Sequence, residues 1–470
     1  MTPPDPSLLG PLIAQLRLAH GWSQQQLAAA LCAAADTPTL TRHEVSRWER
    51  AVRTPGERWR RHLAAVLDAP AGLLADVPTR SGRPGPAGPV ATRSRSALLA
   101  LAHRWAADPG TPLLLNPATI EHVVESTPGR RAAEAAGRSA TDREPDDGWE
   151  APPGAVGLAE LRRLDDLAGG ADLAPAGAYR LRYAVRALRR SGPGGRRRLL
   201  PVLAETAQLA GWLDGDAGHL SSEVDAHRLG LRAAAATGDR ALAGQVLASA
   251  SHLLAGAGDA EGGLLLARAG YAGTRRTASP GLRALLLHRM ALAAALTGRG
   301  PAARRALDAA RRAAETVEPS AEPPWLYWLD SGELAAMTGR ALVALGRPGP
   351  AVSLLGVALR TDRGPRGAAV YGSWLARGLV QLGEVEEAAE VAGTALRDAV
   401  RAGSARAVAA LAEVDRRFAA HRAEPGVRRW RALLAEARPF LLSDPRPFPP
   451  AGAGTRRASP RGGAEPSGTG

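Results

Sequence analysis

The stretch LLLHRMALAAALTGRGPAA, residues 285–303, contains a short turn between two helical segments. Before the turn, side chains recur at the spacing of a helix, so that one face carries Leu285, His288, Leu292 and Leu296. Glycine favours the end of a helix because it accepts the left-handed backbone found there. The small residues Ala302 and Ala303 follow. The stretch therefore predicts two packed helices joined by a tight turn.

Turns of the same kind recur through residues 158–442. They read TGD at 237–239, AGD at 257–259, TGRG at 297–300, LGRPG at 345–349 and LGE at 382–384. The glycines at 258, 298, 346 and 383 are 40, 48 and 37 residues apart, close to the length of a two-helix repeat. The block resembles tetratricopeptide-type helical repeats, without their strict period. Such repeats imply an α-solenoid with a concave groove, and an irregular helical domain is the alternative.

The composition predicts an all-α protein. Aromatic residues make up only 4% of the 470 residues, and β-branched residues are sparse beside Ala, Leu and Arg. The single cysteine, Cys32, cannot form an internal disulfide, which excludes a disulfide-stapled secreted scaffold and favours the cytoplasm. We expect it to be a small core residue. Neither a signal peptide nor a long uncharged apolar run is seen, so no membrane partner is expected.

The charge balance favours a polyanionic partner. Sixty basic residues, all arginine, stand against 46 acidic residues, which gives a formal net charge of +14. Because lysine is absent from the whole sequence, a compositional bias explains Arg in place of Lys at any one position.

Composition also divides the chain into five zones. They are a compact N-terminal domain at 8–77, a Pro/Gly/Ser-rich linker at 78–96, a poorly defined segment at 97–157, the repeat block at 158–442 and a disordered tail at 443–470. The third zone holds one helix candidate, residues 97–107.

The N-terminal domain shows three helical segments. The first spans about residues 8–19, and its apolar stripe consists of Leu9, Leu12, Ile13 and Leu16. Ser23 and Gln26 have the spacing of a capping box in front of the second helix. Thr41 and Glu44 repeat that spacing in front of the third.

The third helix lies within TRHEVSRWERAVRTP, residues 41–55, and has two chemically different faces. The inner face, at about 100° per residue, holds Thr41, Glu44, Val45, Trp48 and Glu49. The outer face holds Arg42, His43, Ser46, Arg47 and Arg50. Such a helix can pack on its own domain and present hydrogen-bond donors and positive charge to a DNA major groove. An ordinary solvated face is the alternative.

These features resemble the Xre/phage-repressor-type helix-turn-helix family over about residues 8–77. The matching residues are Leu16-Arg17, Gly21-Trp22-Ser23-Gln24, Leu27-Ala28, Val45-Ser46-Arg47-Trp48-Glu49-Arg50 and Arg53-Thr54-Pro55. The chain departs from the family in a longer segment between the second and third helices, and at Ala51, where glycine is common.

The resemblance implies a role for each matching position. Contacts to base edges would come from Arg42, His43, Ser46 and Arg47. Contacts to DNA phosphates would come from Gln24, Arg50 and Arg53. Glu49 would pair with an arginine such as Arg17 and hold the helices together, and Trp48, with Trp22 and Trp59, would belong to the core.

No catalytic, cofactor or metal site is predicted, and we expect no enzyme. The sequence lacks the HExxH, GxSxG, GxxxxGK[ST] and CxxC motifs. His219 and His227, without a third ligand nearby, are expected to be ordinary surface residues. Asp165 and Asp166 follow two arginines in LRRLDD and are expected to be helix surface charge rather than an acid/base pair.

The chain as a whole resembles actinobacterial regulators that join such a helix-turn-helix to tetratricopeptide-like repeats. Residues 209–219, 244–259 and 325–351 carry this likeness. It implies a transcriptional regulator, nucleoid-associated in the cytoplasm, that binds double-stranded DNA as a homodimer. A peptide, protein or small-molecule ligand would bind in the repeat groove.

Two further points stay open at this stage. Candidate groove aromatics are Trp325, Tyr327, Trp328, Tyr271 and Trp374, with packing in the repeat core as their alternative. A protein-interaction adaptor, in which the groove binds a partner protein and DNA binding is secondary, is the alternative function.

Overall fold

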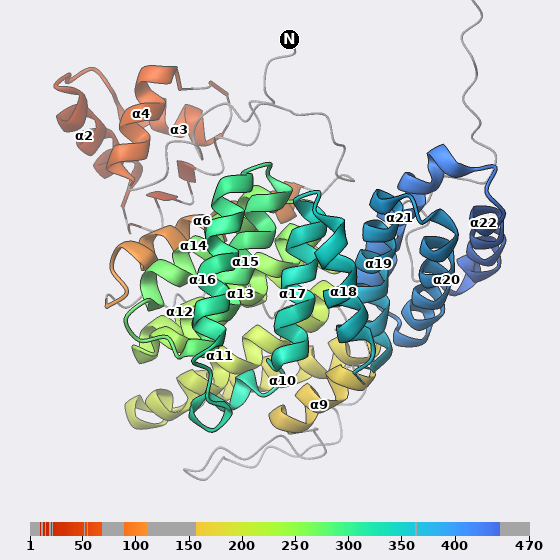
Figure 1. Cartoon of the computed structure of the whole chain (residues 1–470). Helices are drawn as coiled ribbons and strands as arrows, with labels where there is room; N and C mark the ends of the chain where they lie inside the picture. Colours follow the sequence, from red (N-terminus) through yellow and green to blue (C-terminus); the bar gives the residue numbers. More distant parts are fainter. Residues whose placement is uncertain are drawn as a thin grey trace, which may run out of the picture.

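The computed structural model describes residues 10, 13–14, 16–17, 20, 22–50, 52–53, 55–67, 89–110, 157–361 and 364–441. All regular secondary structure in these ranges is helical, which confirms the predicted all-α fold (Figure 1). Within the same ranges, no helix combines the length and the low charge that a membrane span requires.

The N-terminal unit contains α2 (Gln24–Ala35), α3 (Arg42–Glu49) and α4 (Glu57–Val66). Its core is formed by apolar side chains from all three helices, from the segment before them, from the α2–α3 connection and from the end of α4. They are Ile13, Leu16, Leu27, Ala28, Leu31, Leu40, Val45, Trp48, Leu63, Ala64 and Leu67. Two of the four residues predicted for the first apolar stripe, Ile13 and Leu16, are thus buried as expected. The other two, Leu9 and Leu12, lie outside the described residues.

Helix α6 (Pro89–Ala107) begins inside the predicted linker, so the linker prediction is wrong for residues 89–96. Proline suits the first position of a helix, where its missing N–H is not needed. The helix is stabilised by an apolar face, which joins a core with α12 (Leu220–Thr237) and α14 (Ala260–Thr274) through Leu98, Leu99, Leu101 and Trp105. Composition alone misses the start of α6 at Pro89, because the apolar residues that stabilise this helix begin only at Leu98.

From residue 157 onward, adjacent helices pack as pairs (Figure 1). The pairs are α11 (Pro193–Asp216) with α12, α13 (Arg240–Gly256) with α14, α15 (Pro280–Leu296) with α16 (Gly300–Ala314), α17 (Ser331–Ala344) with α18 (Pro348–Leu359), and α19 (Gly364–Leu382) with α20 (Val385–Ala402). The turn glycines all adopt the positive φ that their positions predict, at Gly238, Gly258, Gly298, Gly346 and Gly383.

The first helices of the pairs form a continuous inner row. Each contacts the next, from α11 through α13, α15 and α17 to α19, and α19 contacts α21 (Ala405–Arg417). The row curves back on itself, because α21 also contacts α11. Helix α22 (Pro425–Ala437) packs on α20. The arrangement is an α-solenoid-like stack whose ends meet.

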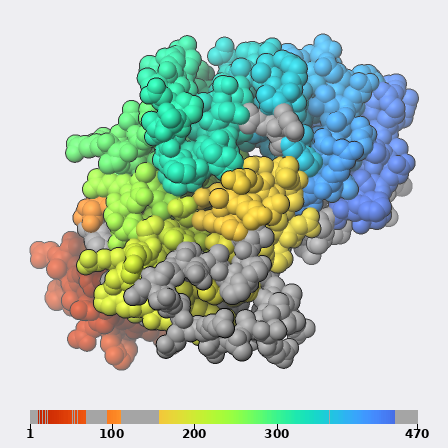
Figure 2. Space-filling model, turned by 90° about the horizontal axis from the view of Figure 1, so that it is seen from below, coloured from red at the N-terminus to blue at the C-terminus, as the bar shows by residue number. Residues whose placement is uncertain are grey.

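Two further helices, α9 (Leu158–Leu167) and α10 (Gly170–Arg190), precede α11 in the chain, and α9 lies where the ends of this row meet. Helix α9 contacts α10, α11 and α19. Seen from below, the yellow segment that contains α9 occupies the middle of the face, enclosed by the repeats (Figure 2). The closure is tight at Gly169, where an added Cβ would overlap the carbonyl oxygen of Ala402.

We expect Gly169→Ala to destabilise the folded protein by about 1–3 kcal/mol, because the backbone carbonyl of Ala402 cannot move aside as a flexible side chain would. Gly192→Ala is the matched control, since nothing lies within 4 Å of the Cβ position at Gly192. Thermal denaturation of both variants measures the difference. Equal melting temperatures would contradict the closure described here.

Candidate functional site

The helices of the N-terminal unit begin in different ways. Ser23 and Gln26 form the predicted capping box: Gln26 N–H donates to Ser23 Oγ at 3.2 Å, and Ser23 N–H donates to Gln26 Oε1 at 2.7 Å. Thr41 precedes α3 without a side-chain hydrogen bond, so the second predicted capping box is wrong. The carboxylate of Glu44 turns instead to Arg47 Nη1 at 3.2 Å and to Arg53 Nη1 at 3.3 Å.

One side of α3 is clamped into the core. Val45 has no solvent exposure and Trp48 is 3% exposed. The partly buried Trp22, Cys32 and Trp59 pack against the same core. These residues therefore belong to the core or pack at its edge, as the sequence predicts.

The opposite side of α3 faces outward. Exposed or half-exposed along it are Arg42, His43, Ser46 and Arg47, the four predicted base contacts. Arg50 is exposed at the end of the helix, and its Nε donates to the carbonyl of Ser46 at 3.2 Å. Arg53 is exposed and reaches back to Glu44. The structure thus brings six of the seven predicted DNA-contacting residues onto one surface.

A partly buried ion pair joins α3 to the segment before α2. Arg17 Nε donates to Glu49 Oε1 at 2.6 Å, and Arg17 Nη1 donates to the Trp22 carbonyl at 2.6 Å. This confirms the predicted Arg17–Glu49 pair. Gln24, the seventh predicted DNA contact, donates from Nε2 to Glu49 Oε2 at 2.7 Å. Its amide therefore holds α3 in place instead of pointing outward.

We expect Glu49→Ala to destabilise the N-terminal unit by about 3–5 kcal/mol, because it leaves the buried Arg17 guanidinium without a counter-charge. Glu44→Ala is the matched control and should cost about 1 kcal/mol or less, since its partners Arg47 and Arg53 are exposed. Hydrogen exchange of the amides in α2, α3 and α4 of the full chain measures both. Similar losses of protection in the two variants would contradict this hierarchy.

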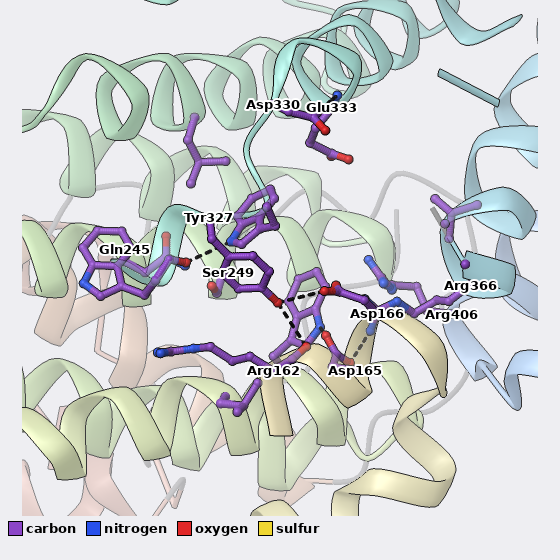
Figure 3. Close-up of a pocket in the computed structure, with 18 of the residues that line it drawn as sticks. Arg162, Asp165, Asp166, Gln245, Ser249, Tyr327, Asp330, Glu333, Arg366 and Arg406 are labelled. Atoms are coloured by element: carbon purple, nitrogen blue, oxygen red, sulfur yellow. Dashed lines mark hydrogen bonds and ion pairs between the residues drawn. The ribbon is translucent and has the colours of Figure 1, made fainter. Parts of the chain in front are cut away.

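A second candidate site is a cavity of about 330 Å³ enclosed by the inner helices (Figure 3). Its lining comes from α9, α11, α13, α15, α17, α19 and α21, together with the loop around the short helix η3 (Pro324–Leu326). Five arginines and four carboxylates are part of this lining. The site is therefore polar and highly charged, although Leu285 and several aromatic rings also line it.

Asp165 lies in the cavity wall, 7% exposed, so its prediction as helix surface charge is wrong. Its carboxylate pairs with Arg366 of α19 and accepts a hydrogen bond from Trp212 Nε1 at 3.0 Å. Burial alone would lower the pKa of Arg366, but the carboxylates of Asp165 and Asp216 raise it. Burial raises the pKa of Asp165, and the charge of Arg366 opposes this effect. The Asp165–Arg366 pair ties α9 to α19.

The neighbouring Asp166 connects α9 to the η3 loop. The hydroxyl of Tyr327 lies 2.9 Å from Asp166 Oδ2 and 3.1 Å from the Arg162 carbonyl oxygen (Figure 3). On the side formed by α17, Arg340 Nη2 lies 3.4 Å from Glu333 Oε1, and the hydroxyl of Tyr371 donates to the same carboxylate. Fixed hydrogen bonds thus hold the cavity wall on both sides.

Three of the five candidate groove aromatics line the cavity, namely Trp325, Tyr327 and Trp328. The other two pack elsewhere: Tyr271 lies against the core between helices, and Trp374 is buried with the Arg377 guanidinium 3.7 Å from its ring centroid. Tyr271 and Trp374 are therefore core-packing residues and do not line the cavity.

His219 and His227 differ in their exposure to solvent. His219 is exposed and lies 3.4 Å from Asp214, whereas His227 has no solvent exposure, so the surface prediction is wrong for His227. Burial lowers the pKa of His227 to about 4, against the opposing effect of its hydrogen bond to the Glu223 carbonyl. His227 is therefore neutral at physiological pH.

Sequence reasoning missed the polar and charged residues of the cavity, above all Gln245, Arg289, Arg366 and Arg406. They come from four different helices, and no local pattern brings them together. One signal was present: Arg289 interrupts the long apolar run that starts at Leu285. A charge inside such a run belongs either to a surface stripe or to a buried polar site.

No protein-family model matches the chain, and no curated protein matches it either. The family resemblance therefore rests on the motif residues quoted from the sequence.

Proposed function

We propose that this chain is a DNA-binding transcriptional regulator. In this proposal, α2 and α3 belong to a helix-turn-helix domain that places α3 in the major groove, and the tetratricopeptide-like repeats bind a signal molecule. The observation that carries the proposal is the division of α3 into a buried side, with Val45 and Trp48, and an exposed side that bears Arg42 and Arg47.

The arginines of the exposed side are suited to read guanine. A guanidinium can donate two hydrogen bonds to O6 and N7 of one base, which gives about 1–3 kcal/mol of discrimination. Arg47 and Arg53 share the Glu44 carboxylate in the free protein. Such exposed ion pairs are worth about 0–1 kcal/mol, so a base or a phosphate can replace Glu44. His43 and Ser46 add donors on the same surface.

Phosphate contacts fit the two ends of this surface. Arg50 and Arg53 lie at the C-terminal end of α3 and are exposed. Gln24 is the first residue of α2, where unpaired backbone N–H groups and the helix dipole favour a phosphate. The proposal therefore places the phosphate at the α2 N-terminus, while the Gln24 amide keeps Glu49 and α3 in position.

Helix α6 physically connects the two proposed functions. Its Ala100 packs against the core of the N-terminal unit, while Leu98 and Trp105 belong to the repeat core. Arg95 Nη2 also donates to Asp259 Oδ1 at 2.7 Å, at the start of α14. A change in the packing of the repeats can reach the N-terminal unit along this helix. We further propose a homodimer, because one small helix-turn-helix unit contacts too little DNA for tight selection.

We expect the double variant Arg42→Ala/Arg47→Ala to lose roughly thirtyfold to 10⁴-fold in affinity for specific DNA, because two potential bidentate base contacts of about 1–3 kcal/mol each are removed. Fluorescence anisotropy with DNA fragments from the chain's own promoter region measures this, and genome-wide occupancy of wild type and Arg47→Ala identifies the sites. Arg312→Ala, an exposed arginine on α16, is the matched control.

Two outcomes would contradict the proposal. The first is no binding by the wild type above background at about 100 mM salt, where non-specific attraction of basic domains is weakened. The second is a cellular function that survives Arg42→Ala/Arg47→Ala but is abolished by substitutions in the cavity. That second outcome would favour the protein-interaction adaptor.

A further inference from the structure

One buried arginine in the cavity has no hydrogen-bond or ion-pair partner among the described residues. Arg289 lies in the middle of α15, is 6% exposed and lines the cavity. Its guanidinium makes no hydrogen bond or ion pair with any described residue, and its buried Nε has no acceptor. A buried, unpaired charge is costly, and proteins normally pair it or remove it.

The other arginines of the cavity lining each have a carboxylate. The pairs are Arg162 with Glu205 at 2.7 Å, Arg340 with Glu333 at 3.4 Å, Arg406 with Asp216 at 3.0 Å, and Arg366 with Asp165. Burial and the nearby Arg340 lower the pKa of Arg289 to about 9. Arg289 therefore stays protonated at neutral pH. The charge of Glu333 acts on it and raises its pKa, but Arg289 is the one arginine of the described lining without a carboxylate at ion-pair distance.

A second polar side chain of the cavity is also unsatisfied. Gln245 on α13 is 4% exposed, and its Oε1 has no hydrogen-bond partner in the part of the chain that the structure describes. Helices α13 and α15 are neighbours in the inner row. An amide can both donate and accept, so Gln245 adds neutral hydrogen-bonding capacity to the same cavity as the Arg289 guanidinium.

The remaining lining indicates the size and the body of a ligand. Leu285 lies four residues before Arg289, on the same side of α15, and Trp325 and Trp328 come from the η3 loop. A cavity of about 330 Å³ accommodates a small organic molecule. Apolar and aromatic walls beside one anchoring charge are typical of sites for amphipathic small molecules.

We propose that this cavity binds a small organic monocarboxylate with an apolar or aromatic body, and that Arg289 anchors its carboxylate while Gln245 hydrogen-bonds beside it. A guanidinium matches the planar carboxylate through two parallel hydrogen bonds. A monocarboxylate supplies the contact counter-charge that Arg289 lacks among the described residues. A dianionic phosphate would bring a second charge close to Asp166 and Glu333. The inference deepens the signal-binding part of the proposed function and depends on that proposal for its regulatory meaning.

The experiment uses phenylacetate as the probe, with phenylacetamide as its neutral counterpart and inorganic phosphate as a competing anion. Each is titrated into the full chain without DNA, followed by tryptophan fluorescence, since Trp212, Trp325 and Trp328 line the cavity. We expect saturable binding of phenylacetate with a dissociation constant of about 1 mM or lower. Phenylacetamide and phosphate should each bind about tenfold more weakly or worse.

Two variants separate binding from folding. Arg289→Met should weaken phenylacetate binding about tenfold or more and should leave the melting temperature unchanged or raised, because it removes an unpaired buried charge. Arg312→Met, at an exposed position on α16, should change neither quantity. A binding defect without a stability defect is a result that a structural role for Arg289 cannot produce.

Several results would overturn the inference. They are an absence of saturable phenylacetate binding, equal binding by Arg289→Met, tighter binding of phosphate than of phenylacetate, or a clear fall in the melting temperature of Arg289→Met. Because no DNA is present, a failure of the carboxylate proposal leaves the DNA-binding proposal standing. Likewise, a failure of DNA binding leaves the titration result intact.

Discussion

The carboxylate of Asp216 joins three helices at a point with no solvent exposure. One oxygen accepts the Gly170 N–H at 2.9 Å, at the start of α10, and the other accepts from Ser404 Oγ at 2.8 Å and Arg406 Nε at 3.0 Å, at α21. Burial alone would raise the pKa of Asp216, but Arg406, Arg366 and these hydrogen bonds hold it below its ordinary value. Because α11 begins the inner row and α21 ends it, this single group closes the row around the cavity.

Similar ion pairs hold the rest of the cavity wall. Asp165 and Arg366 tie α9 to α19, and Arg340 with Glu333 fixes the wall at α17. Buried ion pairs add little net stability, because desolvation offsets most of their attraction, and their value here lies in holding side chains in one geometry. Arg289 departs from this pattern. In a wall where the other arginines have carboxylates, an unpaired guanidinium indicates a counter-charge supplied from outside the chain.

The sequence predicted features that local spacing determines and missed those that depend on distant segments. Val45 and Trp48 could be assigned to the core, and the Ser23–Gln26 capping box identified, because each pattern spans a few residues. The Thr41 box failed because two arginines compete for Glu44, and spacing cannot rank partners that the fold brings close. The cavity was beyond reach for the same reason: Asp165 meets Arg366 across 201 residues of chain.

The binding energy that one proposed ligand can supply limits how far it can shift a conformational equilibrium, and this limit favours a dimer. A ligand shifts an arrangement of the N-terminal unit only through its different affinity for the two states. Reversing a 1:99 equilibrium requires about a 10⁴-fold difference, whereas one charged hydrogen-bonded anchor supplies about tenfold to a hundredfold. Two cavities that act on one shared equilibrium multiply their effects and approach the required value. The proposed homodimer therefore suits the proposed ligand anchor of one arginine per chain, and α6, whose Ala100 packs on the core of the N-terminal unit, is the helix through which a change would reach α3.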